Sequence, residues 1–224
     1  MSKIISRIGQ FPESYRFSDL RRHWDGFLRV FSFQVAGQKH RQEVMDRGSA
    51  VMVLPVDWQA SRLYLVEQPR FNLAFQVVAA AADALMEARA VGSSSASVSV
   101  PSAAVNTLDV PAGGIEPDEA PEAAAIREIR EETGLVITAA DLTLVSDHYT
   151  SVGGSTERQL CYLAAVGPDT PRTVPEGDGD EVMATHEVSF AEAAQLLRDG
   201  RVRHASFAVL IREVLWRAAG SGPV

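Results

Sequence analysis

Residues 113–135 read GGIEPDEAPEAAAIREIREETGL, a glycine turn that leads into an amphipathic helix, and this stretch decides the fold. Pro121 suits the first position of the helix, because its missing N–H group would lack a helical partner there in any case. Gly134 suits the position just past the last turn, where a left-handed backbone favours glycine. The spacing therefore predicts a helix between these two residues.

The predicted helix carries a cluster of carboxylates on one face. Glu128 and Glu132 are four residues apart, so they lie one turn above the other, and Glu131 lies beside them. Stacked carboxylates repel one another, whereas a hard divalent cation binds such oxygen ligands. Arg127 precedes Glu131 by four residues and can form an ion pair that orients its carboxylate. The pattern indicates a cation site.

The turn before the helix supports the same interpretation. Gly113 lets the backbone approach closely, so that a neighbouring carbonyl, that of Ala112, can also reach a metal. The helix can also be accounted for without any metal. Glu, Arg and Ala are strong helix formers, and most Glu-rich helices are solvated acidic surfaces. Taken alone, the helix favours this alternative.

The full spacing of residues 113–135 resembles the Nudix box, a long gapped signature that is far more specific than a short glycine motif. The positions that match it are Gly113, Glu119, Arg127-Glu128-Ile129, Glu131-Glu132 and Gly134-Leu135. The resemblance implies an α/β protein with the Nudix fold, an α/β/α sandwich around a mixed sheet. It also implies hydrolysis of a nucleoside diphosphate linked to another moiety, with Mg²⁺ or Mn²⁺ as cofactor. The residues expected to bind or support the metal are Glu128, Glu131, Glu132, Ala112 and Arg127.

The composition excludes several classes of function. The chain has 224 residues, of which 21 are basic and 29 acidic, and its formal net charge is −8. An acidic protein gains no long-range attraction for nucleic acid or for an anionic membrane, and it repels anionic substrates unless a cation intervenes. The single cysteine, Cys161, excludes an internal disulfide and a cysteine-based zinc site. Because the chain shows no signal peptide and no apolar run of transmembrane length, we expect a cytoplasmic protein.

Alternation of apolar residues and turn signals predict the remaining elements of one α/β domain. Strands are expected at 27–35, 41–44, 50–56, 63–68, 141–149 and 158–166, with a short strand that ends at 110, and helices are expected at 189–200 and 205–218. Residues 77–104 differ in composition, because 77–91 are rich in alanine and favour a helix, whereas 92–97 are typical of a flexible linker. We interpret 77–104 as an insertion in a hydrolase domain that spans 46–224 and follows an N-terminal β extension at 1–45.

Several segments outside the box resemble the ADP-ribose pyrophosphatase branch of the Nudix family. They are RQEV at 41–44, VEQPR at 66–70, PAG at 111–113 and SVGGSTE at 151–157. The resemblance implies ADP-ribose or a related nucleoside diphosphate sugar as the substrate, bound by Arg41, Arg70, Gly154 and Glu157. For the three charged residues, the alternative is a surface ion pair. The resemblance also implies a homodimer in which residues 1–45 contribute to the partner's site.

The branch also places a catalytic glutamate on the loop that follows the strand at 158–166. Here that loop reads PEGDGDEVMATHEV at 175–188, and we expect Glu181 to act as the general base, with Asp180 as the alternative. Such a base reaches the attacking water once the loop closes over the substrate. The other interpretation is a loop that is acidic because it is solvated.

One residue departs from the ADP-ribose pattern. That branch usually has proline after the serine of the loop at 151–157, whereas this chain has Val152. Enzymes that act on UDP-glucose or GDP-mannose vary at the same place, so both stay alternative substrates. A Nudix module that binds a nucleotide sugar without cleaving it is a further alternative, although such modules usually have an eroded box.

Overall fold

A computed structural model describes residues 14, 16–70, 73, 101–176 and 184–220 of the chain. The chain divides into two compact units. The N-terminal unit comprises Met1–Gly48 with Tyr149–Glu157, and the main unit comprises Ser49–His148 with Arg158–Val224. The predicted helix at 77–91, the linker at 92–97 and the proposed bases Asp180 and Glu181 lie outside the described residues.

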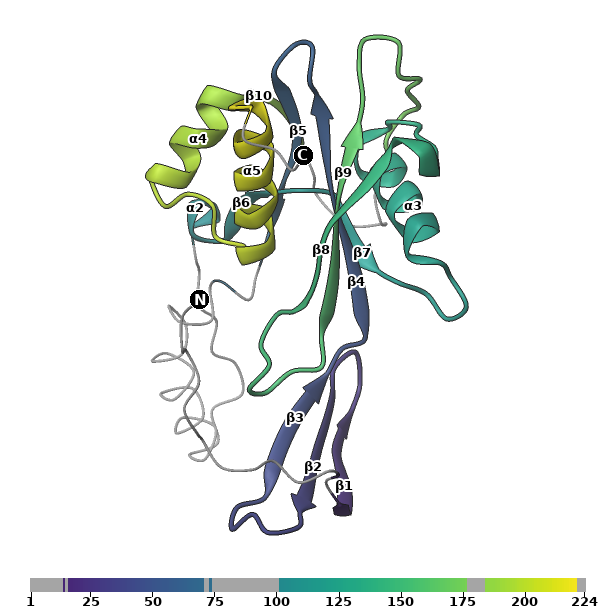
Figure 1. The fold of residues 1–224 in the computed structure, drawn as a ribbon, viewed down its shortest axis with the longest axis vertical. Coiled ribbons are helices and arrows are strands. Elements are labelled where there is room, and N and C mark those ends of the chain that lie inside the picture. The colour runs from purple at the N-terminus through teal and green to yellow at the C-terminus, as the bar shows by residue number, and fades with distance from the viewer. Residues whose placement is uncertain (1–13, 15, 71–72, 74–100, 177–183, 221–224) are drawn as a thin grey trace, which may run out of the picture. The chain divides into compact units, whose positions relative to one another are not determined.

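The main unit is built around one mixed sheet (Figure 1). Five strands follow the order β10-β5-β4-β9-β8, while β6 pairs with β5 and β7 pairs with β4. Strand β4 runs parallel to β9 and antiparallel to β5 and β7. The strands are β4 (Ser49–Asp57), β5 (Arg62–Pro69), β6 (Asn106–Asp109), β7 (Ala112–Gly114), β8 (Leu142–Tyr149), β9 (Arg158–Ala165) and β10 (Ala184–Ser189).

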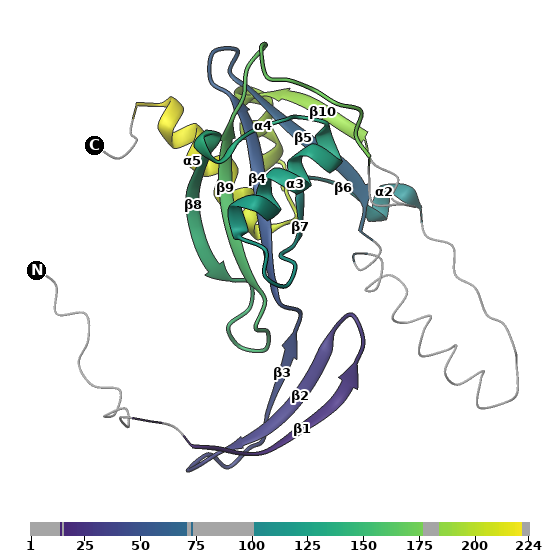
Figure 2. The same ribbon diagram turned by 90° about the vertical axis from the view of Figure 1, so that its right-hand side faces the viewer.

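Helices cover both faces of this sheet, as Figures 1 and 2 show. Alternate residues of β4 point to opposite faces, so Met52 and Leu54 pack with α4 (Phe190–Arg198) and α5 (Ala205–Ala218). Val51 and Val53 pack with α3 (Pro121–Thr133) on the other face. Two shorter helices, α2 (Ser102–Val105) and the 3₁₀ helix η2 (Ala139–Asp141), precede β6 and β8. The predicted α/β/α sandwich around a mixed sheet is confirmed, and Cys161 is buried in the core.

The ends of the helices form as their residues predict. Helix α3 begins at Pro121, and Gly134 ends it with a φ of 72°. Helix α4 begins with a reciprocal pair of hydrogen bonds between Ser189 and Glu192, which is a capping box. Within α3, Ile129 is fully buried, whereas Ile126 is only partly buried. Ala124 and Ala125 fill the rest of the contact with the sheet, because small side chains let the helix approach closely.

Gly134 is confined by a second constraint besides its left-handed backbone. A Cβ atom there would overlap the carbonyl oxygen of Thr173. Replacing Gly134 with Ala is therefore expected to cost about 2–4 kcal/mol in the free energy of unfolding, the sum of a backbone penalty and a steric one. Gly200 is the matched control, since its φ is also positive, at 65°, but nothing lies within 4 Å of a Cβ there. Gly200→Ala should cost only about 1 kcal/mol in urea denaturation, and an equal loss for both variants would contradict the steric effect of Thr173.

The N-terminal unit contains an antiparallel sheet in the order β1-β2-β3. Its strands are β1 (Phe17–Asp25), β2 (Arg29–Val35) and β3 (Gln42–Asp46). Strand β1 was not expected from the sequence, because every residue in it is exposed and its apolar residues do not alternate. Its pairing with β2 is irregular between Ser18 and Arg21, where Asp19 has a φ of 50°. In the described part of the chain, no helix is long and apolar enough to cross a membrane.

Candidate active site

A close approach between the glycine turn and helix α3 defines the centre of the candidate site. The Cα of Gly113, in β7, faces the side chain of Glu128, in α3. A Cβ at Gly113 would overlap that carboxylate, and even the farther oxygen, Oε2, would lie only 2.6 Å away. Only glycine leaves room for this contact. The turn thereby brings the backbone that follows Ala112 directly beside Glu128, one of the predicted metal ligands.

Arg127 ties the loop that precedes α3 to the helix itself. Its Nε and Nη2 atoms donate to the two carboxylate oxygens of Glu119, both at 3.0 Å, and Nη2 also donates to the carbonyl of Gly114 at 3.0 Å. Glu119 in turn accepts from the backbone N–H of Glu116 at 2.9 Å. The bond from Arg127 is the main reason that the pKa of Glu119 lies below its usual value and that the pKa of Arg127 is raised. The forked pair fixes the loop.

The same guanidinium reaches two of the carboxylates on α3. Nη1 of Arg127 lies 2.5 Å from Oε1 of Glu128 and 3.3 Å from Oε2 of Glu131. The predicted pair between Arg127 and Glu131 is therefore present. The contact with Glu119 was missed, because a partner eight residues away across a loop follows from no helical spacing. The fixed position of Glu119 in the box was the only signal that it has a role.

Two carboxylates of α3 are largely buried. Glu128 is 8% exposed and Glu132 is 7% exposed. Burial is the main cause that raises the pKa of Glu128, because the charged form is disfavoured where water is excluded. The guanidinium of Arg127 faces three carboxylates, those of Glu119, Glu128 and Glu131, and Arg130 lies 3.9 Å from Glu131. The site thus carries an excess of negative charge.

This set of side chains fits a hard divalent cation. The donors are carboxylate oxygens only, which is the chemistry that Mg²⁺ prefers. In the part of the chain that the structure describes, no three His, Cys, Asp or Glu side chains are arranged as a ready cation site. Glu128 is instead turned toward Arg127 and Gly113. A bound cation would neutralise part of the negative charge that the guanidinium of Arg127 neutralises in its absence.

The acidic loop begins against the end of α3. The backbone N–H of Thr173 donates to the carbonyl of Gly134 at 2.7 Å, and that of Glu176 donates to the carbonyl of Glu131 at 3.0 Å. The described chain resumes at Ala184 in β10, which pairs with Glu67 of β5. The described residues before 177 therefore contact the end of the carboxylate helix, and those from Ala184 onward lie in the sheet beside β5.

Arg70 lies in a buried polar network of the main unit. Its Nη2 atom is 3.8 Å from Oδ2 of Asp109, and the side chain of Asp109 is only 3% exposed. Asp109 also bonds to Nδ1 of His204 at 3.0 Å. The side chain of Arg70 is 37% exposed, so part of it is accessible to a ligand.

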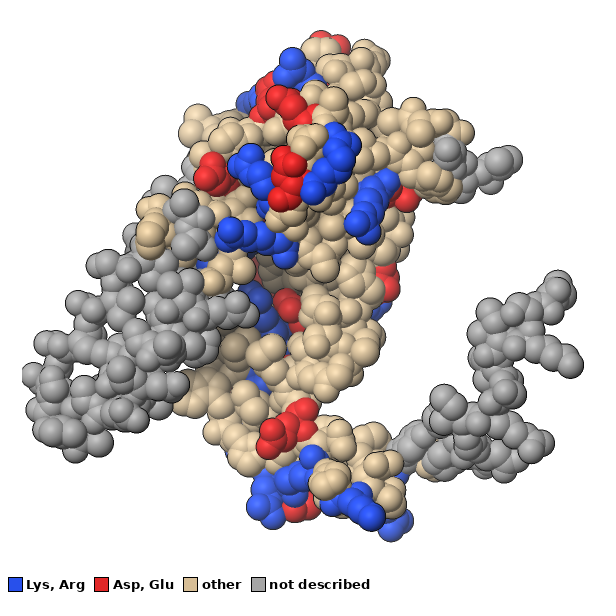
Figure 3. Space-filling view, turned by 90° about the vertical axis from the view of Figure 1, so that its left-hand side faces the viewer, with Lys and Arg blue, Asp and Glu red and all other residues tan. Residues whose placement is uncertain are grey.

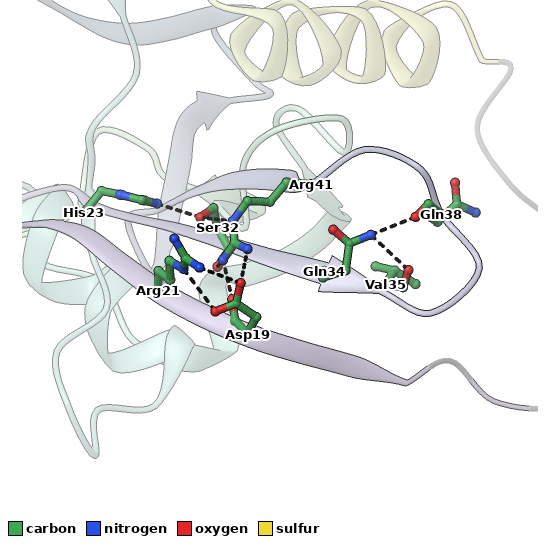
Figure 4. A network of polar contacts seen from close by, with 8 residues as sticks. All are labelled: Asp19, Arg21, His23, Ser32, Gln34, Val35, Gln38 and Arg41. Carbon is green, nitrogen blue, oxygen red and sulfur yellow. Dashed lines mark hydrogen bonds and ion pairs between the residues drawn. The ribbon is translucent and has the colours of Figure 1, made fainter.

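The other three substrate-binding candidates lie in the N-terminal unit. Figure 4 shows that Arg41 is surrounded by partners within this unit: Nε donates to Oγ of Ser32 at 2.7 Å, and Nη1 to Asp19 at 2.6 Å. Nη2 also donates to the carbonyls of Ser32 and Asp19. Glu157 accepts from Thr150 at 3.1 Å and pairs with Arg47 at 3.5 Å, and the carbonyl of Gly154 accepts from Met45 at 2.8 Å. A substrate would bind Arg41 only by exchanging some of these contacts.

Comparison with known proteins places this loop and helix in a known family. The family model of the NUDIX domain matches residues 95–210, more than half of the chain. The chain belongs to the Nudix family. The matched residues include the glycine turn, the whole of helix α3 and the acidic loop at 175–188.

Curated Nudix relatives are similar over different shares of the chain. A GDP-mannose pyrophosphatase from Cronobacter sakazakii is 30% identical over 181 residues, which cover 80% of each chain. An ADP-ribose pyrophosphatase from Bacillus subtilis is 35% identical over 105 residues, which cover 47% of this chain and 55% of that one. A crystal structure of an ADP compounds hydrolase matches 95% of this chain and all of that chain with a TM-score of 0.67, at 18% identity. This last likeness supports the Nudix fold alone.

The forked pair in the Nudix loop predicts a pH-dependent contribution to stability. Because Arg127 holds the pKa of Glu119 below its ordinary value of 4.5, the pair stabilises the folded state above that pH. The contribution is lost as the pH falls through the lowered pKa. Glu119→Gln should therefore reduce the free energy of unfolding by about 1 kcal/mol near neutral pH and by almost nothing well below the lowered pKa, as urea denaturation would measure. Glu116→Gln, an exposed change in the same loop, should have no such effect, and an unchanged loss for Glu119→Gln in acid would contradict the role given to the pair.

Proposed function

We propose that this Nudix protein hydrolyses the diphosphate bond of a nucleoside diphosphate sugar and releases a nucleoside monophosphate and a sugar phosphate. The observation that carries the proposal is the contact of Gly113 with the buried carboxylate of Glu128, beside the forked pair of Arg127 and Glu119. This arrangement holds a cluster of buried negative charge next to a backbone turn. A diphosphate is itself anionic and would be repelled without a cation.

The cation would be Mg²⁺, or Mn²⁺ in its place, held by Glu128, Glu131 and Glu132 with the carbonyl of Ala112. When bound, such an ion neutralises the diphosphate, stabilises the charge that develops in the transition state and activates water. Arg127 then acts as a positioning residue, because it fixes the loop through Glu119 and orients the carboxylates of α3. Glu131, which pairs with Arg127, would also hold the cation.

The general base is proposed to be Glu181, with Asp180 as the alternative. Either residue would accept a proton from the attacking water. The flanks of their loop support this assignment, since Glu176 is bonded to the backbone of Glu131 in the carboxylate helix. A loop anchored in this way can deliver a carboxylate to the same site when it closes over a substrate.

ADP-ribose and GDP-mannose are the two leading substrates. The segments at 41–44, 66–70 and 151–157 favour ADP-ribose, and an ADP-ribose pyrophosphatase is among the relatives. A GDP-mannose pyrophosphatase aligns over a larger share of the chain, and Val152 departs from the ADP-ribose pattern. UDP-glucose is a third candidate. The residues that we propose to bind the substrate are Arg41, Arg70, Gly154 and Glu157.

A panel of nucleoside diphosphate sugars tests the proposal directly. Each compound is assayed for release of its nucleoside monophosphate with Mg²⁺, with Mn²⁺ and with EDTA. Release of AMP or GMP that EDTA abolishes is expected for at least one compound. If calorimetry showed tight binding of ADP-ribose but no monophosphate appeared with either metal, the protein would be a binding module and the hydrolase proposal would be wrong.

We further propose that the protein is a homodimer assembled through the N-terminal unit. Strand β1 lies at the edge of its sheet, and large apolar side chains of this region are exposed: Phe17, Leu20, Trp24 and Phe27. Unpaired edges and exposed apolar groups of this kind favour pairing with a second chain. Light scattering should give the mass of a dimer for the native chain and of a monomer for Leu20→Lys. Val209→Lys, a comparable change on helix α5, should stay dimeric, and a monomeric native chain would refute the assembly.

A further inference from the structure

A polar cavity lies at the edge of the main sheet, with a volume of about 460 Å³. Its walls come from β5, β6 and β10 and from the connection between α4 and α5. The residues that line it include Glu67, Leu108, His186, Val188, Asp199 and Arg201. The volume falls within the range of about 300–1,000 Å³ that small-molecule sites occupy.

This cavity lies on the face of the sheet opposite the carboxylate helix. Glu67 is two residues from Leu65, and the side chains of alternate residues in a strand point to the same face. Leu65 packs in the cluster that includes α4 and α5, whereas its neighbour Tyr64 packs in the cluster that includes α3. Leu108 and Val188, which also line the cavity, pack against the α4–α5 cluster too. The cavity is therefore separate from the site of Glu128 and Glu132.

The acidic groups of the cavity are already engaged with neighbours. Glu67 bonds to Nε2 of His186 at 2.9 Å and accepts from the amide of Asn106 at 3.5 Å. Asp199 accepts from the amide of Gln195 at 2.6 Å. These contacts keep the two carboxylates on the walls while leaving each with further lone pairs for a hydroxyl donor.

Arg201, a basic residue that lines the cavity, differs from these carboxylates. Arg201 is exposed, and none of the carboxylates that the structure describes forms an ion pair with it. It belongs to the run Arg198-Asp199-Gly200-Arg201-Val202-Arg203, a local concentration of positive charge in a chain whose net charge is −8. Figure 3 faces this side of the main unit and shows basic and acidic side chains gathered around a hollow. A planar guanidinium with free donors is suited to a phosphate group.

We propose that this cavity binds a phosphate monoester of a sugar. Arg201 would hold the phosphate at the mouth, and the carboxylates of Glu67 and Asp199 would accept hydrogen bonds from sugar hydroxyls inside. A bare phosphate would fill only a small part of about 460 Å³, so the ligand carries a larger polar group. The site does not depend on the reaction proposed above, although both products of that reaction belong to this class of compound.

Calorimetry on the full chain with ribose 5-phosphate as the probe tests the site. EDTA is present throughout, so that no cation can recruit the phosphate to the carboxylates of α3. The native chain should bind the probe, and Arg201→Gln should weaken binding about tenfold or more, as expected when a charge-assisted hydrogen bond is removed. Arg198→Gln is the matched control. Arg198 belongs to the same run but bonds to Gln195 at 2.7 Å and does not line the cavity, so binding should be unchanged.

One further variant and two further ligands distinguish binding in this cavity from binding at the carboxylate helix or to phosphate alone. Glu132→Gln, a change on the opposite face, should leave binding of ribose 5-phosphate in EDTA intact. Ribose and inorganic phosphate should each bind at least about tenfold more weakly than ribose 5-phosphate. The proposal is overturned if the native chain does not bind the probe at millimolar concentration, if Arg201→Gln binds as the native chain does, or if inorganic phosphate binds equally well.

Discussion

Replacing Glu132 with Gln is expected to lower Mg²⁺-dependent turnover by at least about 100-fold while the protein stays folded. The side chain is 7% exposed and lies on the face of α3 that carries Glu128. An amide has almost the same shape as a carboxylate but supplies no negative charge to a cation. Because burial penalises a charged group, the isosteric neutral side chain should cost little in stability.

A second glutamate of the same helix supplies the control for this change. Glu122 lies in the first turn of α3, is exposed, and accepts from the hydroxyl of Tyr162 at 3.4 Å, a bond that a glutamine oxygen can also accept. Glu122→Gln should retain turnover close to that of the native chain. Activity is measured as release of nucleoside monophosphate, and thermal melting in EDTA checks the fold. Near-native turnover by Glu132→Gln would sink its assignment as a metal ligand.

Replacing Gly113 with Ala should reduce turnover by about 10- to 100-fold, although the substitution adds only a methyl group. The added Cβ would overlap the carboxylate of Glu128, which must therefore move away from the turn. The overlapping atoms are the end of a flexible side chain, so the free energy of unfolding should change by less than about 1 kcal/mol. Activity and stability should thus respond very differently to this substitution.

The neighbouring glycine, Gly114, provides the matched control for Gly113→Ala. Gly114 lies in the same strand, β7, and a Cβ there would have no heavy atom within 4 Å. Gly114→Ala should consequently be nearly silent in both activity and urea denaturation. If Gly113→Ala and Gly114→Ala had equal activity, the close approach to Glu128 would have no catalytic importance. If both unfolded, the effect would belong to the strand rather than to the site.

Local signals predicted the framework of the site well. The proline at 121 and the glycine at 134 mark both ends of α3, and the apolar run at 50–56 predicts the buried central strand β4. Such signals are encoded within a few residues, since capping, backbone conformation and periodicity depend on near neighbours. The i to i+4 relation between Arg127 and Glu131 is of the same kind, and it is present.

Contacts between distant residues could not be predicted in this way. The fork between Arg127 and Glu119 spans a loop, and the approach of Thr173 to Gly134 joins segments that are far apart in the chain. Strand β1 gave no periodic signal, because it is exposed along its whole length and exists through its pairing with β2. In each case the partner is chosen by the packing of the whole unit.

The sequence by itself therefore determined the Nudix box and the order of the main strands and helices, and it predicted the carboxylates that a cation would use. The tertiary structure alone decided that Glu128 rests on Gly113, that Arg41 is enclosed by Asp19 and Ser32, and that a polar cavity forms around Glu67. The physical reason is the separation along the chain between the residues that interact. Turns, caps and helical faces follow from interactions over one or two turns of chain, whereas burial, compensation of charge and cavities arise only when remote segments meet.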